Sequence, residues 1–104
     1  MKIKFYKDKR GNEGEELIAS TTTRLARELS RFNEHITQVE VHLSEDNSKK
    51  AGVNDKRCVI LVEVQDLQPI SITGHAGSYE QAVNGAILKL KMSLHATYGR
   101  LRVY

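Results

Sequence analysis

The chain has 104 residues, of which 39% are hydrophobic and 28% charged, and its formal net charge is +3. These values are typical of one globular domain spanning residues 1–104, and they exclude a disordered chain. No apolar run approaches the roughly 20 residues that cross a membrane, and the first residues lack the apolar centre of a signal peptide. We therefore expect a cytoplasmic protein with no membrane partner.

The first third of the chain predicts a strand followed by a helix. Lys2 to Tyr6 alternates polar and apolar residues, as a short strand does. Asn12 and Glu15 have the spacing of a capping pair for a helix that continues to about Phe32. The face of this helix that we expect to be buried repeats with 4-3-4-3 spacing and consists of Ile18, Thr22, Leu25, Leu29 and Phe32.

Three segments of strand length follow, at residues 36–44, 57–65 and 68–76. Each segment either alternates polar and apolar residues or is continuously apolar, which predicts strands with one face toward a core. In the middle segment, Val59 and Leu61 fall on the face opposite Ile60. If Ile60 points inward, these two residues lie on an outer face that could host a partner or weak self-association. Scattered exposed apolar residues explain the same pattern.

The apolar period then changes from two to about 3.6, which predicts a final helix over residues 78–94. Ser78 and Gln81 form a capping box at its start, and Gly99 is the expected stop. The order is therefore β-α-β-β-β-α. Its first crossover makes the first two strands parallel, and short connections make the last three antiparallel. We predict an α+β two-layer sandwich in which both helices cover one face of a four-stranded mixed sheet.

Arg24, Arg27 and Arg31 lie within about 60° of each other on a helical wheel, on the side away from the apolar residues. Guanidinium groups suit phosphate contacts, because they are always charged and offer a bidentate fork. A solvated helix face with local ion pairs is the alternative interpretation.

A second set of cations ends the chain without an acid among them. If the two helices lie side by side, this set joins the arginines in one polyanion-binding surface. The alternative is that these cations complement the dipole of the final helix. The set consists of Lys89, Lys91, His95, Arg100 and Arg102, with Lys7, Lys9 and Arg10 as a possible extension.

We find no constellation that predicts an enzyme, a cofactor site or a metal site. The four histidines lack metal-ligand spacing to each other or to the single cysteine, Cys58. Cys58 lies in the most apolar segment, which favours a buried structural thiol over a nucleophile. No pair of acids on an apolar background indicates acid–base chemistry.

With this order of elements, the chain resembles the ribosome hibernation-promoting factor family, also called ribosome-associated inhibitors or sigma-modulation proteins. The resemblance is carried by ITQVEVHL at 36–43, ISITG at 70–74, SYEQAV at 78–83 and KLKMSL at 89–94. The chain departs from the family at Asn84, where an acid is usual, and at 95–99, where lysines are usual.

The resemblance implies a double-stranded-RNA-binding-like fold and a non-enzymatic translation inhibitor, the short form of a hibernation factor. Its partner would be the small ribosomal subunit, contacted at rRNA phosphates through basic faces of both helices. By position, Arg24, Arg27 and Arg31 fit the role of the first helix, and Lys89 and Lys91 fit that of the second. The alternative function is a diverged, non-ribosomal protein-interaction module on the same scaffold.

Overall fold

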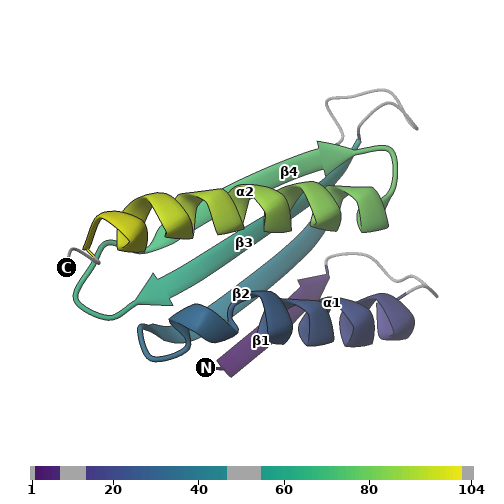
Figure 1. The fold of residues 1–104 in the computed structure, drawn as a ribbon. Helices are drawn as coiled ribbons and strands as arrows, with labels where there is room; N and C mark the ends of the chain where they lie inside the picture. Colours follow the sequence, from purple (N-terminus) through teal and green to yellow (C-terminus); the bar gives the residue numbers. More distant parts are fainter. Residues whose placement is uncertain (1, 8–13, 47–54, 102–104) are drawn as a thin grey trace.

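The computed structural model describes residues 2–7, 14–46 and 55–101. These residues form four strands, two α-helices and one short 3-10 helix in the predicted order β-α-β-β-β-α (Figure 1). The elements are β1 (Lys2–Lys7), α1 (Gly14–Glu28), η1 (Ser30–Phe32), β2 (Ile36–Glu45), β3 (Lys56–Val64), β4 (Ile70–Ala76) and α2 (Tyr79–Leu101).

The four strands form one mixed sheet in the order β1-β2-β3-β4. β1 runs parallel to β2, with Ile3 opposite Val39, and the β2–β3 and β3–β4 pairs are antiparallel. This pairing confirms the predicted topology. It follows from the helical crossover between β1 and β2 and from the short connection between β3 and β4.

Both helices cover the same face of the sheet and run side by side in the same direction (Figure 1). Their contacts show the same direction, because residues later in α1 meet residues later in α2. Arg24 is bonded to Asn84, and Glu28 is paired with Lys91. The amino ends of the two helices therefore lie at one end of the molecule, and their carboxyl ends lie at the other.

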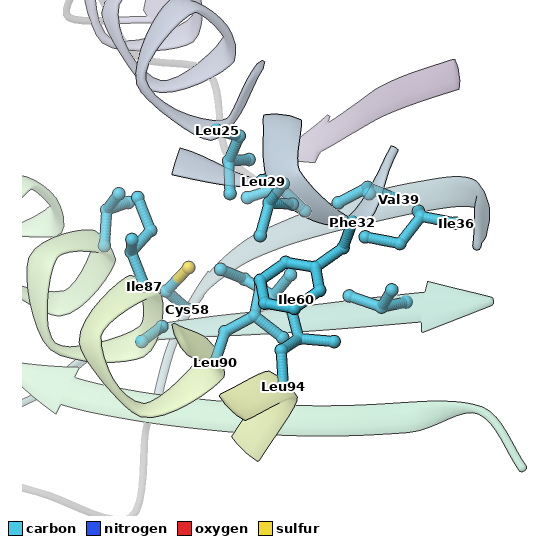
Figure 2. Close-up of a cluster of buried hydrophobic side chains, with 14 of the residues drawn as sticks. Leu25, Leu29, Phe32, Ile36, Val39, Cys58, Ile60, Ile87, Leu90 and Leu94 are labelled. Atoms are coloured by element: carbon cyan, nitrogen blue, oxygen red, sulfur yellow. The ribbon is translucent and has the colours of Figure 1, made fainter. Parts of the chain in front are cut away.

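The core lies between the helix layer and the inward faces of β2 and β3 (Figure 2). Val39 and Val41 from β2 and Ile60 and Val62 from β3 are fully buried, because alternate residues of a strand point to the same face. The helices complete the core with Leu25, Leu29, Ile87, Leu90 and Leu94.

The first helix differs from its prediction, because α1 ends at Glu28 and a separate 3-10 turn carries Phe32. Residues three apart eclipse each other in a 3-10 helix, so Leu29 and Phe32 can both reach the core. Thr21 is buried, with 2% of its surface exposed, whereas the predicted Thr22 is half-buried. Thr21, Leu25 and Leu29 are spaced four residues apart, and this spacing determines which side of α1 faces the core. Asn12, the predicted cap, lies outside the described residues.

The last helix begins as predicted but continues further. The Ser78 hydroxyl accepts a hydrogen bond of 3.2 Å from the Gln81 backbone N–H, which caps the first turn. The prediction that Gly99 ends the helix is wrong, because α2 runs to Leu101. Tyr98 is buried against Phe32 and His35, and this packing favours continuation of the helix past a residue of low helical propensity.

The backbone of β4 approaches that of α2 closely at Gly74. A Cβ atom placed on Gly74 would lie 2.6 Å from the carbonyl oxygen of Ala82 and 3.0 Å from the backbone nitrogen of Ala86. Only glycine leaves room for this approach. Gly74 therefore sets the distance between the sheet and the second helix.

Candidate nucleic-acid interface

A groove of about 620 Å³ runs between the two helices, and Arg24 and Arg27 stand on its α1 side. The guanidinium of Arg24 donates a hydrogen bond to the side-chain oxygen of Asn84 on α2. Asn84 is one of the positions at which the sequence departs from the family that it resembles, and the structure gives it a role in joining the helices. Arg24 is consequently half-buried and engaged within the protein.

Arg27 and Arg31 are exposed, and neither forms an ion pair with any residue that the structure describes. The guanidinium carbon of Arg31 lies 5.9 Å from the centre of the Phe32 ring, which orients it without neutralising its charge. Both charges are therefore available to a phosphate group.

Lys91 lies on the side of α2 that faces α1. Its ammonium Nζ is 2.9 Å from Oε1 of Glu28. The hydrogen bond from Lys91 is the main cause that holds the pKa of the Glu28 carboxyl below its usual value, and the charges of Lys91, Arg27 and Arg24 add to it. This pair neutralises one of the predicted cations in the free protein.

Lys89 lies on the opposite flank of α2, two residues earlier in the helix. Its ammonium donates a hydrogen bond of 2.9 Å to the backbone carbonyl of Thr73 in β4. β4 is an edge strand, so this contact satisfies a carbonyl that has no neighbouring strand. Of the two predicted lysines of the second helix, only Lys91 lies beside the arginines of α1.

The other predicted cations are dispersed. His95 is exposed and meets the Phe32 ring edge-on, with 5.7 Å between the ring centres. The Lys7 ammonium is buried 5.6 Å from the centre of the Tyr79 ring, and it makes no hydrogen bond to the part of the chain that the structure describes. The structure does not describe Lys9, Arg10, Arg102 or the side chain of Arg100.

A second cavity, of about 520 Å³, lies where the helices end and was not predicted from the sequence. The rings of His35 and Tyr98 stack on its wall, with 4.6 Å between centres and 22° between planes. Its remaining lining includes Arg31, Phe32, Asp66 and Leu67. Tyr98 is more than 60 residues from Phe32 and His35 in sequence, so only the fold brings it to them. We call this cavity the His35 pocket.

Among the described residues, both helices lie on one face of the sheet, as predicted, and neither covers the outer face. Val59 and Leu61 lie there, but both are only half-exposed. Nearby, the Tyr6 ring stacks on His42 at 4.6 Å, and His42 Nε2 lies 3.0 Å from a carboxylate oxygen of Glu40. This face is therefore mixed in polarity rather than a broad apolar patch.

Cys58 is fully buried in β3, and burial raises the pKa of its thiol to about 12. A thiol with this pKa is not a nucleophile at neutral pH.

Among the described residues, no group of three or more histidine, cysteine or acidic side chains is placed to hold a metal ion. In that same part of the chain, no helix combines the length and hydropathy needed to cross a membrane.

At the level of sequence, no family model and no curated protein matches this chain. At the level of structure, it is similar to a ribosomal subunit interface protein from Coxiella burnetii, with a TM-score of 0.72 and 15% identity over 95% of this chain and 99% of that one. It is also similar to the N-terminal domain of Protein Y from Thermus thermophilus, with a TM-score of 0.71 and 17% identity over 93% of this chain and 99% of that one. Both neighbours are of the hibernation-promoting-factor type. The chain therefore has the fold of the hibernation-promoting factors, the family that its sequence resembles.

Proposed function

We propose that this protein binds the small ribosomal subunit in the cytoplasm and silences translation by contacting rRNA. The observation that carries the proposal is the fold shared, over nearly the whole chain, with a ribosomal subunit interface protein. The proposal needs no catalytic group or cofactor.

The charge of the helix layer supports RNA as the partner. Arg27 and Arg31 are exposed and free of ion pairs within the described residues, and they follow each other along α1 and η1. Double-stranded RNA is recognised mainly through its shape and its phosphates, for which two free guanidinium groups, one on α1 and one on η1, are suited. Lys91 joins this surface when a phosphate displaces Glu28 from it.

Co-sedimentation of the purified protein with ribosomes across a salt series tests this function. We expect binding at low salt that weakens as salt rises, because phosphate contacts release counterions. The double variant Arg27→Glu and Arg31→Glu is expected to lose ribosome binding. Milder replacement of both by Gln reduces the slope of log K against log salt by roughly 2.

A charge-matched control separates this surface from a general effect of net charge. Lys2 and Lys4 are exposed on β1, and the double variant Lys2→Glu and Lys4→Glu changes the net charge by the same amount as the arginine reversal. It is expected to retain ribosome binding. Equal loss in both double variants would refute a specific role for the arginines, and wild-type protein that never sediments with ribosomes would refute the function itself.

A protein-interaction module is the second candidate, and one observation favours it. Leu88 and Met92 lie one turn apart on α2 and are 58% and 65% exposed. Apolar side chains of this size on one helix face are compatible with a protein partner or a second copy of the chain. A stable dimer that ignores ribosomes in sedimentation velocity would support this candidate over rRNA binding.

A further inference from the structure

The His35 pocket combines the features that a nucleotide requires. It is concave, its volume of about 520 Å³ falls within the range of small-molecule sites, and it is lined by both aromatic and charged groups. We propose that the His35 pocket binds one unpaired nucleotide of an RNA strand, with the base stacked on His35 and the phosphate held by Arg31. This inference deepens the proposed function and rests on RNA being the partner.

Backbone hydrogen bonds and a ring stack hold His35 in place. The His35 carbonyl accepts a 2.8 Å hydrogen bond from the backbone N–H of Gln65, and its own N–H donates one of 2.9 Å to Phe32. One face of the His35 ring rests on Tyr98, which is only 5% exposed. Because His35 is itself exposed, its ring offers aromatic surface to a base, and such stacking is a main contribution to single-strand binding.

The hydroxyl of Tyr98 is an unusual feature of the aromatic cluster formed by Phe32, His35 and Tyr98. It is buried and has no hydrogen-bond partner among the described residues, and burial raises the pKa of this phenol. A buried hydroxyl is normally paired, so keeping Tyr98 here carries a cost. The ring stack that Tyr98 supports under His35 is the contact that offsets it.

The two charged groups of the pocket match opposite parts of a nucleotide. Arg31 lies between Arg27 of α1 and the pocket along the chain, so a strand whose phosphates follow Arg27 and Arg31 brings its next base toward His35. Asp66 stands in the turn after β3 in the left-handed backbone region, with φ of 65°, and lines the same cavity. Its carboxylate accepts hydrogen bonds from amino groups and repels carbonyl oxygens, which favours cytosine over uracil.

The experiment is an NMR titration of the full chain with the single-stranded tetranucleotides CCCC and UUUU, and with CMP. We expect CCCC to shift the resonances of His35, Leu67 and Tyr98, and to bind more tightly than UUUU or CMP. The variant Asp66→Asn, which tolerates the same backbone, is expected to bind CCCC and UUUU equally.

Matched histidine variants test the stacking. His35→Ala is expected to weaken CCCC binding roughly tenfold, and His35→Phe, which keeps an aromatic ring, retains it. His95→Ala is the control, because His95 also touches Phe32 but does not line the pocket. Equal effects of His35→Ala and His95→Ala, or shifts confined to α1, would overturn the proposal. So would CMP binding as tightly as CCCC, because the neighbouring nucleotides would then contribute nothing.

These outcomes are separate from those of the proposed function. Ribosome co-sedimentation without any shift in the His35 pocket would refute the pocket and keep the function. Pocket shifts with CCCC but no co-sedimentation would keep the pocket and refute the function.

Discussion

Glu28 and Lys91 link the two helices through an ion pair of 2.9 Å, one helical turn beyond the Arg24–Asn84 hydrogen bond on α1. The two links hold α1 and α2 side by side above the apolar core that both helices share. The groove between them therefore depends on polar contacts that can be tested one at a time.

The Glu28–Lys91 pair predicts a stability difference that depends on pH. Since the pKa of Glu28 is lowered from 4.5, its contribution is present above that pH and is lost as pH falls through the lowered pKa. Lys91→Met is therefore expected to reduce the melting temperature slightly at pH 7 and to match wild type near pH 2. Thermal unfolding followed by circular dichroism measures this, and an equal deficit at both pH values would contradict it.

Gly74 and Gly85 predict opposite effects of the same substitution. Gly74→Ala is expected to destabilise the fold by about 1–3 kcal/mol, because the new methyl meets the backbone of α2. Gly85→Ala on α2 meets nothing within 4 Å and is expected to stabilise by about 0.5–1 kcal/mol through helical propensity. Urea denaturation compares the two, and a stable Gly74→Ala protein would show that α2 is not held at this distance.

Cys58 is expected to resist alkylation in the native protein. Its thiol is buried and its pKa is raised to about 12, so little thiolate exists at pH 8. Mass spectrometry after treatment with iodoacetamide should show unmodified protein in buffer and complete modification in urea. Fast alkylation in buffer would mean that β3 opens locally, contrary to its position inside the sheet.

Lys89 is expected to matter for self-association rather than for RNA. Lys89→Ala exposes the carbonyl of Thr73 on the edge strand β4, which then can pair with a second chain. Sedimentation velocity should show concentration-dependent association of this variant. Lys91→Ala removes the same charge but keeps the edge contact, and it should remain like wild type.

The fold could be predicted from the sequence because its signals are local. The alternation around Val39, Val41, Ile60 and Val62 fixed which faces are buried, and the capping box at Ser78 fixed the start of α2. The three consecutive threonines did not allow a prediction of which side of α1 faces the core, since any one of them could be buried. Packing of the sheet and α2 against α1 selected Thr21.

The candidate site was less predictable, because its contacts join distant parts of the chain. Lys89 and Lys91 look alike in sequence, yet one contacts the sheet edge and the other contacts α1. The His35 pocket was missed because Tyr98 lies in the last turns of α2, far from its partners in sequence, and His35 and Asp66 lie in connections between elements. No local pattern reports a cavity of this kind.

The close approach at Gly74 also bears on the entropy of binding. A helix packed at backbone-contact distance from its sheet cannot slide or tilt without breaking that contact, so the approach at Gly74 restricts movement of α2 relative to the sheet. When a partner docks at the groove beside α2, only exposed side chains such as Arg27 and Arg31 have to become ordered, and the helix layer does not. The small residue that fixes the layers thus lowers the conformational cost of forming a complex.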